Sequence, residues 1–313
     1  MSASPIKLAI IGVGKIVRDQ HVPHVEKNPR YQLVAGVSPN SKLDGPPTFK
    51  DLDALFASGV AFDAASVCTP PQVRHALALP LIKAGKHVFL EKPPGATVSE
   101  VEDLKAAADT AGRTLFTSWH SREAPGVKAA ADWINGRKLK SVEIIWREDV
   151  RHWHPGQDWI WQAGGLGVFD PGVNALSIAT AILPPFFVRK AELEFPANRD
   201  APIAARIDFA LDGGGRMSAD FDWRQTGPQT WDIRVEAEDG HSLRLSLGGS
   251  ALEIDGHAAT LQPEREYGAL YDRFADLVDA GRSDVDVRPL QQTADAFLLG
   301  RRIETEAFYD PAA

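Results

Sequence analysis

The sequence of 313 residues contains a single cysteine, Cys68. One cysteine excludes an internal disulfide framework and a zinc site built from cysteine clusters. An excess of positive charge is also missing, because 34 Lys and Arg against 42 Asp and Glu give a formal net charge of −8. Without a basic surface that collects phosphate groups, nucleic acid and anionic membranes are not expected partners. We expect a small-molecule substrate.

Long hydrophobic runs are absent as well. No stretch of about 18 consecutive apolar residues, the length that spans a bilayer, occurs in the chain. The first residues show no charged-then-apolar leader, so we expect a cytoplasmic protein. With 44% hydrophobic and 24% charged residues the composition is that of a soluble globular chain, and the length favours two domains.

Strands and helices alternate over residues 1–120, which predicts parallel strands joined by right-handed crossovers. The predicted strands are 7–11, 31–37, 63–68, 87–91 and 114–119, and the predicted helices are 52–57, 73–84 and 98–111. The sequence therefore predicts an N-terminal doubly wound (Rossmann) parallel-sheet domain over residues 1–120.

From residue 121 onward, strand-like runs follow one another with short turns, which predicts a large, mainly antiparallel open sheet. The predicted strands are 140–150, 187–195, 203–211, 216–223, 231–237 and 241–247, followed by two helices at 267–280 and 293–307. We expect an α+β substrate-binding domain over residues 121–313, which makes the chain α/β overall.

A glycine turn follows the first predicted strand. Gly12 and Gly14 have the spacing in which the first glycine makes a tight turn and the second lets the backbone approach a pyrophosphate. Val17 stands where a third glycine is usual, so a plain strand-to-helix turn is the alternative interpretation. The position of the turn at the start of the β–α alternation favours dinucleotide binding.

The end of the second predicted strand is where the ribose 2′ position of a dinucleotide is read. Ser38 and Lys42 lie there, with no acid before Asp44. An acid would bind the NAD ribose and repel a 2′-phosphate, whereas serine and lysine accept the phosphate. We expect NADP, and also NAD, as the cofactor; the alternative is a polar turn that the cofactor does not touch.

A lysine ends the strand predicted at 87–91. Pro93 and Pro94 stop this strand because they remove backbone donors and restrict the preceding residues. Lys92 therefore lies at the carboxyl end of a parallel strand, the end that faces the ligand crevice in an open sheet. This position makes Lys92 a candidate to move a proton or to polarise an oxygen of the substrate.

Residues 151–174 concentrate indole and imidazole groups. Indole faces beside short hydrogen-bonding side chains suit a pyranose, which offers an apolar C–H face and several hydroxyls. The residues concerned are His152, Trp153, His154, Trp159, Trp161 and Asp170. Core tryptophans and structural histidines are the alternative interpretation. No metal is expected, since no third ligand accompanies the two histidines at a recognised spacing.

Asp170 and Asn174 are four residues apart at the start of a helix predicted over 174–182, so both side chains would project on one side. Asp170 has an alternative role as a cap of this helix. Capping and catalysis are compatible.

Several of these strings together resemble the glucose–fructose oxidoreductase / inositol dehydrogenase (Gfo/Idh/MocA) family. The strings are Gly12-Val13-Gly14-Lys15-Ile16, Cys68-Thr69-Pro70-Pro71 followed by His75, and Gly85-Lys86-His87-Val88-Phe89-Leu90-Glu91-Lys92-Pro93. Within the family, the second half resembles the bacterial dehydrogenases that act on C1 of L-arabinose and D-galactose. This likeness rests on Trp119-His120-Ser121, Glu148-Asp149-Val150-Arg151, Trp153-His154-Pro155-Gly156-Gln157, and the segment from Trp161 to Asn174.

The resemblance implies a set of site residues. Those expected at the cofactor are Gly12, Gly14, Lys15, Ile16, Ser38, Cys68, Thr69, Pro70, His75, Glu91 and Lys92. Those expected at the sugar are His120, Glu148, Trp153, His154, Asn174 and Trp231. The family commonly has a histidine where this chain has Asn174. Because asparagine cannot take a proton, catalysis would fall to Lys92 and Asp170.

The expected reaction is oxidation of an aldopyranose at C1 to an aldonolactone, with hydride transfer to NAD(P). Oxidation of a polyol ring carbon, as in inositol dehydrogenases, is one alternative. A dinucleotide-binding sugar sensor without turnover is another, although a sensor would not need both Lys92 and Asp170. The open sheet also leads us to expect a homodimer.

Overall fold

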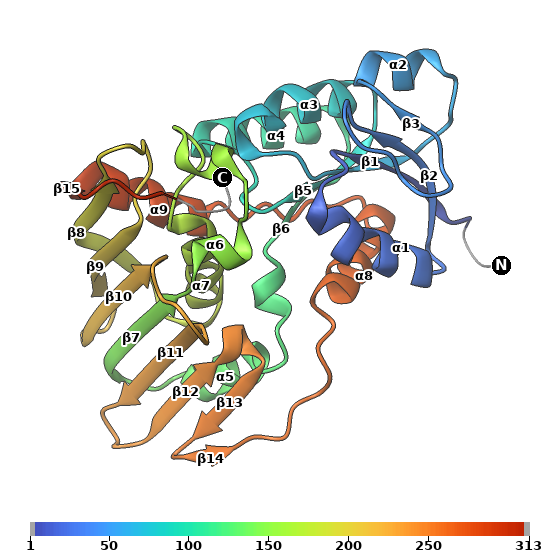
Figure 1. Ribbon diagram of the computed structural model, residues 1–313. Helices are drawn as coiled ribbons and strands as arrows, with labels where there is room; N and C mark the ends of the chain where they lie inside the picture. Colours follow the sequence, from blue (N-terminus) through green and yellow to red (C-terminus); the bar gives the residue numbers. More distant parts are fainter. Residues whose placement is uncertain (1–3, 310–313) are drawn as a thin grey trace. The chain divides into compact units, whose positions relative to one another are not determined.

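The computed structural model describes residues 4–309 of the chain. They form two compact units: unit 1 runs to His120 and takes in Glu266–Val287, and unit 2 holds Ser121–Arg265 and the described residues from Arg288 onward (Figure 1). The expected division into 1–120 and 121–313 differs from this grouping in one segment. Residues 266–287 group with unit 1 because their helix buries Tyr271 and Phe274 in that unit's core.

Unit 1 contains a six-stranded sheet in the order β3-β2-β1-β4-β5-β6, and all neighbouring strands are parallel. The strands are β1 (Ile6–Ile11), β2 (Tyr31–Val37), β3 (Thr48–Phe49), β4 (Ala64–Val67), β5 (His87–Glu91) and β6 (Leu115–Ser118). The prediction of a doubly wound parallel sheet is confirmed. β1 and β4 are neighbours, and the strands that follow each of them in the chain are added on opposite sides of this pair. The carboxyl ends of β1 and β4 therefore form the switch point of the sheet.

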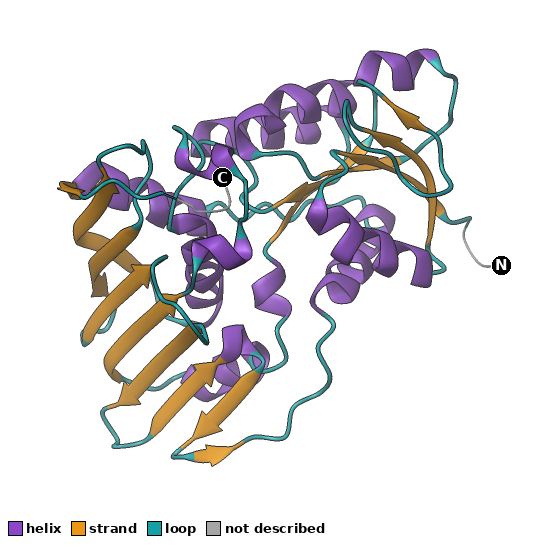
Figure 2. Cartoon of the chain, in the orientation of Figure 1, coloured by secondary structure: helices purple, strands orange, loops and turns teal. Residues whose placement is uncertain are grey.

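Helices cover both faces of this sheet (Figure 2). They are α1 (Val22–Lys27), α2 (Leu52–Ala57), α3 (Pro71–Lys83), α4 (Val98–Ala111) and α8 (Glu266–Asp279), and a π-helical stretch, η1 (Val17–His21), precedes α1. Local signals set their ends: the side chains of Asp51 and Thr97 cap α2 and α4, and Gly112 ends α4 in the left-handed conformation.

Unit 2 contains a nine-stranded sheet in the order β14-β13-β12-β11-β7-β10-β9-β8-β15. The strands are β7 (Leu139–Arg147), β8 (Phe186–Pro196), β9 (Ala204–Leu211), β10 (Arg216–Asp222), β11 (Thr230–Ala237), β12 (Ser242–Ser246), β13 (Ala251–Ile254), β14 (His257–Ala258) and β15 (Gly300–Thr305). Most neighbours are antiparallel, as predicted, but β7 and β10 are parallel and so are β8 and β15. The sheet is therefore mixed.

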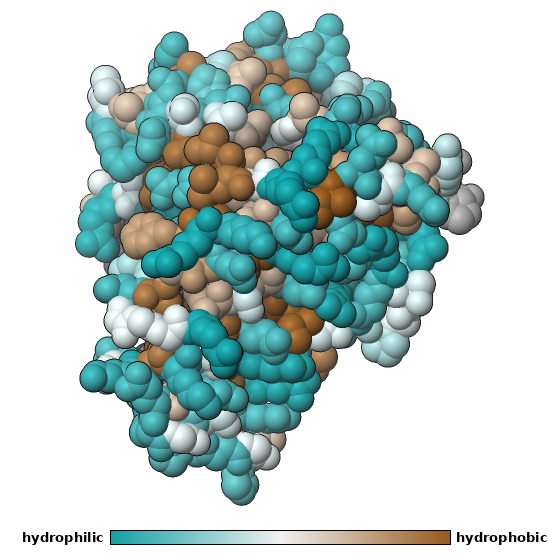
Figure 3. All heavy atoms as spheres, turned by 90° about the vertical axis from the view of Figure 1, so that its left-hand side faces the viewer, coloured by the Kyte–Doolittle hydropathy of each residue, from teal (hydrophilic) through white to brown (hydrophobic). Residues whose placement is uncertain are grey.

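The two faces of the nine-stranded sheet differ. Helices α5 (Val127–Ile134), α7 (Phe169–Ile182) and α9 (Arg288–Leu299) contribute to the apolar core that one face buries. On β10, Met217, Ala219 and Phe221 are buried, while the alternating residues are exposed or half-buried. Hydrophilic residues cover most of the face shown in Figure 3, and apolar residues form separate patches there.

Three predicted elements differ from the structure by more than two residues at one end or both. The strand predicted over 140–150 ends at Arg147, because Asp149 caps a short helix, α6 (Val150–Trp153). The helix predicted over 174–182 begins at Phe169, which places Asp170 in its first turn. The helix predicted over 293–307 is replaced by α9 and β15. Gly300 is the first residue of β15, and a Cβ atom on it would lie 2.4 Å from the Ala296 carbonyl oxygen. The residues that follow pair with β8.

Candidate active site

The glycine turn after β1 has the geometry that a dinucleotide needs. Gly12 has φ +90°, and a Cβ atom there would lie 2.8 Å from Cγ2 of Thr69. A Cβ atom on Gly14 would meet no atom within 4 Å. The first glycine is therefore required by the fold, whereas the second leaves open room beside the backbone. Val17 replaces the third glycine and is fully buried.

Thr69, which follows β4, offers a polar atom beside this turn. Its Oγ1 is buried and has no hydrogen-bond partner among the described residues. A buried hydroxyl without a partner is costly, so such an atom beside a glycine turn fits a site that a ligand completes. Pro70 follows and occupies the N-cap position of α3. Together with Gly12 and Gly14, these residues fit a bound dinucleotide.

The remaining residues predicted at the cofactor are placed around the same unit. Lys15 and Ile16 are exposed next to the glycine turn, and Lys15 forms an ion pair with Asp19. Ser38 directly follows β2, and its Oγ accepts a hydrogen bond from the Ser41 backbone N–H at 3.2 Å. His75 contacts Asp103 of α4 at 2.8 Å, a contact that joins two helices. Their roles toward a cofactor stay predictions.

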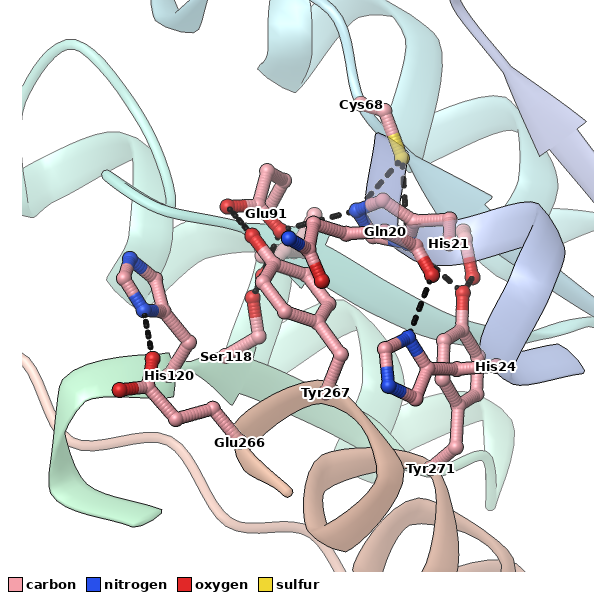
Figure 4. A network of polar contacts seen from close by, with 12 residues as sticks. Gln20, His21, His24, Cys68, Glu91, Ser118, His120, Glu266, Tyr267 and Tyr271 are labelled. Atoms are coloured by element: carbon pink, nitrogen blue, oxygen red, sulfur yellow. Dashed lines mark hydrogen bonds and ion pairs between the residues drawn. The ribbon is translucent and has the colours of Figure 1, made fainter. Parts of the chain in front are cut away.

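A buried polar network surrounds the end of β5 (Figure 4). The Glu91 carboxylate, 4% exposed, accepts hydrogen bonds from His21 Nε2 at 3.1 Å, from Tyr267 Oη at 3.1 Å and from Ser118 Oγ at 3.3 Å. His21 Nδ1 lies 2.7 Å from Tyr271 Oη, and the ring also contacts Cys68 Sγ. Cys68 and Glu91 thus direct their side chains into this network.

The network holds an ion pair. Burial opposes the charged form of Glu91, yet the hydrogen bond and the charge of His21 outweigh it and lower the pKa of Glu91 to about 2. Burial would likewise lower the pKa of His21, but Cys68, Tyr271 and Glu91 together raise it well above its usual value. An imidazolium and a carboxylate therefore neutralise each other directly before Lys92.

Arg74 holds the backbone on both sides of Lys92. Its guanidinium, on α3 and 2% exposed, donates to the carbonyl oxygens of Thr69, Glu91 and Pro93. Sequence reasoning missed Arg74 and His21, since no spacing marks either residue. Tyr267 and Tyr271 were also missed, although their spacing of four residues on a predicted helix identified one apolar helix face.

In unit 2, indole groups surround a buried carboxylate. Glu148 directly follows β7 and is 3% exposed, and its carboxylate accepts hydrogen bonds from Trp223 Nε1 at 3.2 Å and from Trp231 Nε1 at 2.9 Å. Ring centroids of Trp153 and Trp231 lie 5.2 Å apart. Trp223, fully buried, was missed because as the last residue of a predicted strand it was indistinguishable from core.

His154 connects this cluster to α7. Its ring lies 5.4 Å from that of Trp223, and its Nε2 lies 3.4 Å from Oδ2 of Asp170. Asp170 is buried, whereas Asn174, one turn later, is partly exposed in a helix whose other residues are nearly all buried. Gly172 allows the close approach of α7 to the sheet, since a Cβ atom there would lie 2.7 Å from the Phe221 ring.

The predicted sugar residues do not all group together. Unit 2 holds Glu148, Trp153, His154, Asp170, Asn174 and Trp231, while His120 belongs to unit 1. His120 Nδ1 contacts Glu266 at 2.6 Å and its ring stacks on Tyr267 (Figure 4). Trp161 is buried against Trp223, which favours the core interpretation for that tryptophan.

Two features are absent from residues 4–309. No group of three or more His, Cys, Asp or Glu side chains is arranged to hold a metal ion. Within the same residues, no helix has the length and apolar character needed to cross a membrane.

Each unit offers a distinct chemistry. Unit 1 provides a dinucleotide turn and a lysine at the carboxyl end of β5. Unit 2 provides buried carboxylates, an imidazole, an amide and indole faces, which suit a ring that carries many hydroxyls.

Comparisons with known proteins show which family the chain resembles. Residues 6–118 match the family model GFO_IDH_MocA, described as an oxidoreductase family with an NAD-binding Rossmann fold. The chain is 44% identical to a galactose 1-dehydrogenase of Pseudomonas fluorescens over 311 residues, which cover 98% of this chain and 99% of that protein.

Solved structures extend the likeness. The crystal structure of a D-galactose-1-dehydrogenase protein from Rhizobium etli superposes with a TM-score of 0.94 and 56% identity over 99% of both chains. A 3-ketoreductase from Actinomadura kijaniata, solved with NADP, has a TM-score of 0.84 at 21% identity, over 96% of this chain and 99% of that one, and supports the fold alone. On the near full-length identity and the matched Rossmann segment, the chain belongs to the Gfo/Idh/MocA family of oxidoreductases.

Proposed function

We propose that the protein is an NAD(P)-dependent sugar 1-dehydrogenase that oxidises the C1 hydroxyl of an aldopyranose, D-galactose or L-arabinose, to the aldonolactone. The observation that carries the proposal is the buried Glu148 carboxylate, ringed by Trp223 and Trp231, with His154 and Asp170 beside the cluster. The likeness to two galactose 1-dehydrogenases supports it.

The reaction removes a hydride from C1 and a proton from the C1 hydroxyl. A bound nicotinamide supplies the hydride acceptor. Lys92 and Asp170 are the groups that we propose for the proton, because Asn174 can only orient a hydroxyl. Lys92 would also stabilise negative charge on the C1 oxygen through its ammonium group.

Sugar recognition is assigned to the cluster in unit 2. Glu148 and His154 would accept or donate hydrogen bonds to ring hydroxyls, and Trp153 and Trp231 would cover the apolar face of the ring. We keep His120 as a further sugar contact. L-Arabinose and D-galactose share the configuration at C2 to C4 and differ by a hydroxymethyl group, a difference that pockets reject weakly.

The test is a panel of sugars and cofactors. Initial rates with D-galactose, L-arabinose, D-glucose, D-xylose and myo-inositol, each with NADP and NAD, are measured for the wild type, Lys92→Met and Asp170→Asn. We expect D-galactose and L-arabinose to be oxidised fastest, with the lactone detected by NMR before it hydrolyses. Each variant is expected to lose turnover by about 100-fold to 10,000-fold, the usual range for a group that transfers a proton.

Three results would contradict the proposal in different ways. Oxidation of inositol with no aldose turned over would favour the polyol reaction. Binding of a sugar and a dinucleotide without any turnover would favour a sensor. Full activity in Lys92→Met would remove the lysine from the proton transfer.

A further inference from the structure

The last described residues of the chain run beside the loop that joins β8 to β9. β15 ends at Thr305, whose carbonyl oxygen accepts a hydrogen bond from the Ala197 N–H at 3.1 Å. Further on, the Asn198 side chain donates to the Phe308 carbonyl at 3.0 Å and accepts from the Phe308 N–H at 2.9 Å. We call residues 306–309 the tail segment. The Asn198 amide bonds to this segment as the backbone of a neighbouring strand would.

The tail segment lies against Trp161. Ring centroids of Phe308 and Trp161 are 5.5 Å apart, and Phe308 packs against the apolar core of unit 2. The Arg199 guanidinium carbon lies 5.2 Å from the centroid of the same indole. Trp161 is 6% exposed, although it ends a single 3₁₀ turn in the irregular stretch between α6 and α7. The burial of this indole therefore depends in part on Phe308.

The β8–β9 loop also holds the backbone around Trp161. The Asp200 N–H donates to the Trp161 carbonyl at 3.1 Å, and the Val168 N–H donates to the Pro202 carbonyl at 2.8 Å. The approach is close, because a Cβ atom on Gly167 would lie 2.3 Å from the Pro202 carbonyl oxygen. One loop thus bonds to the tail segment and to the segment that carries Trp161.

Trp161 connects the tail segment to the buried carboxylate of unit 2. Ring centroids of Trp161 and Trp223 lie 5.2 Å apart with the planes at 70°, so the two indoles meet edge to face. Trp223 Nε1 donates to Glu148 Oε1 at 3.2 Å. A displaced Trp223 would weaken this bond, and a buried carboxylate is destabilised when it loses a donor. The position of Glu148 therefore depends on indoles that Phe308 helps to hold.

We propose that Phe308 is a positioning residue for the sugar site: it holds Trp161 against Trp223 and thereby fixes the Glu148 carboxylate. This inference rests on the proposed function, in which Glu148 binds hydroxyls of the sugar. Removal of the Phe308 ring leaves a gap beside Trp161, into which the indole can move. Because Glu148 binds the sugar and does not transfer the proton, the effect belongs to sugar affinity.

Steady-state kinetics with D-galactose and L-arabinose, together with titration of NADPH and NADH, test the inference on the full chain. The variants are Phe308→Ala, Phe308→Tyr, which retains the ring, Asn198→Ala, which removes the bonds to the tail segment, and the control Tyr309→Ala. Tyr309 is adjacent to Phe308 and 74% exposed. Trp223→Phe, alone and combined with Phe308→Ala, removes the indole donor to Glu148.

Phe308→Ala should raise the KM for the sugar by about 3-fold to 30-fold, with kcat changed by less than about 3-fold, the range for a residue that acts on a ligand without touching it. Asn198→Ala should raise KM by a smaller factor, while Phe308→Tyr and Tyr309→Ala should retain the wild-type KM. Dinucleotide affinity should stay unchanged in all these variants, because unit 1 carries the glycine turn. In the Trp223→Phe background, Phe308→Ala should add less than about 2-fold.

Other results would overturn the inference. A wild-type KM in Phe308→Ala would do so and leave the proposed function intact, and so would an effect of equal size with and without Trp223→Phe. If Phe308→Ala is unfolded by circular dichroism, Asn198→Ala decides, and a wild-type KM there is the contrary result. Equal losses of kcat, sugar affinity and dinucleotide affinity would mean that the tail segment only stabilises the fold. No turnover of any sugar by the wild type would overturn the proposed function together with this inference.

Discussion

Asn174 is the residue whose chemistry most constrains the proton transfer that we propose. Its amide lies one turn after Asp170 on α7, and it is partly exposed while most of that helix is buried. An amide can orient a hydroxyl but cannot accept its proton at neutral pH. We therefore expect Asn174 and Asp170 to affect different kinetic parameters, although both lie on one face of the helix.

Asn174→Ala should raise KM by about 10-fold with a smaller effect on kcat, because it removes one hydrogen bond to the bound sugar. Asp170→Asn, which preserves shape, should lower kcat with little change in KM. Steady-state kinetics on both variants under the same conditions provides the comparison. A loss of kcat in Asn174→Ala as large as that in Asp170→Asn would contradict an orienting role.

His21 and Glu91 carry opposite charges inside unit 1, so the stability of the fold should depend on pH. The pKa of Glu91 is lowered from 4.5 to about 2, so its contribution is present above pH 4.5 and is lost as the pH falls toward 2. The pKa of His21 is raised above 6.5, so its contribution is complete below pH 6.5 and is lost as the pH rises through the folded-state pKa. Both contributions are complete between pH 4.5 and pH 6.5.

His21→Gln should lower the free energy of unfolding by about 3–5 kcal/mol, because it leaves a buried carboxylate without its cation. Urea unfolding of the wild type and the variant, followed by circular dichroism across the pH range, measures the difference. We expect the largest gap between pH 4.5 and pH 6.5. A gap that does not change with pH would show that the pair is not ionised.

At the scale of elements, a side chain of α3 holds the backbone at the end of β5. The Arg74 guanidinium contacts the carbonyl oxygens of Glu91 and Pro93, which flank Lys92. A misplacement of about 1 Å in a reacting group can reduce the rate by about 100-fold. We therefore propose that Arg74 positions Lys92.

Arg74→Ala should lower kcat by about 10-fold to 100-fold, and guanidinium ion at a concentration below denaturation should restore part of the loss. Arg74→Lys should recover less, because a single ammonium lacks the planar fork that reaches several carbonyls. The measurement is kcat with and without added guanidinium. Rescue of Arg74→Lys to the wild-type rate would contradict the requirement for a fork.

The turn between β1 and η1 permits a comparison of two glycines. Gly12→Ala is strained by φ +90° and by the Thr69 contact, so it should destabilise the fold by about 1–3 kcal/mol. Gly14→Ala meets no atom within 4 Å, so it should retain stability but bind NADPH more weakly. Thermal unfolding and dinucleotide titration of both variants separate the two effects. Equal destabilisation by both substitutions would contradict this assignment.

At the scale of the whole molecule, the uncovered face of the nine-stranded sheet is the surface for which we propose self-association. Arginines on this face already pair with acids of neighbouring strands, such as Arg147 with Asp220 and Arg234 with Glu143. Charges that are paired within the chain cost less to bury against a second copy. We expect a homodimer.

Light scattering after size-exclusion chromatography should give the mass of two chains for the wild type. Arg234→Glu should shift the equilibrium toward one chain, since it places a further acid beside Asp232 and Glu143. Lys27→Ala, in unit 1, is the matched control. A wild-type mass of one chain at micromolar concentration would contradict dimerisation.

Much of unit 1 was predictable because its signals are local. The exact bounds of β2, β5 and α4 followed from apolar runs ended by turn residues, glycine or proline. Unit 2 was predicted as a succession of strands, but its parallel strand pairs were not predicted. The order in which strands pair depends on tertiary contacts, which the local sequence does not specify. Residues 300–305 illustrate this limit: they were predicted as the continuation of a helix, yet they pair with β8 as a strand.

The sequence by itself determined the alternation that makes a Rossmann unit, the glycine turn, and the prolines that stop β5 after Lys92, because each is a short-range property of the backbone. Only the tertiary structure decided which groups donate hydrogen bonds to Glu91, since His21 and Tyr267 lie 70 and 176 residues away. The same holds for the indoles of Trp223 and Trp231 that contact Glu148. A buried carboxylate needs hydrogen-bond donors, and the fold supplies them from segments that are far apart in the sequence. No spacing in the chain predicts which segments these are.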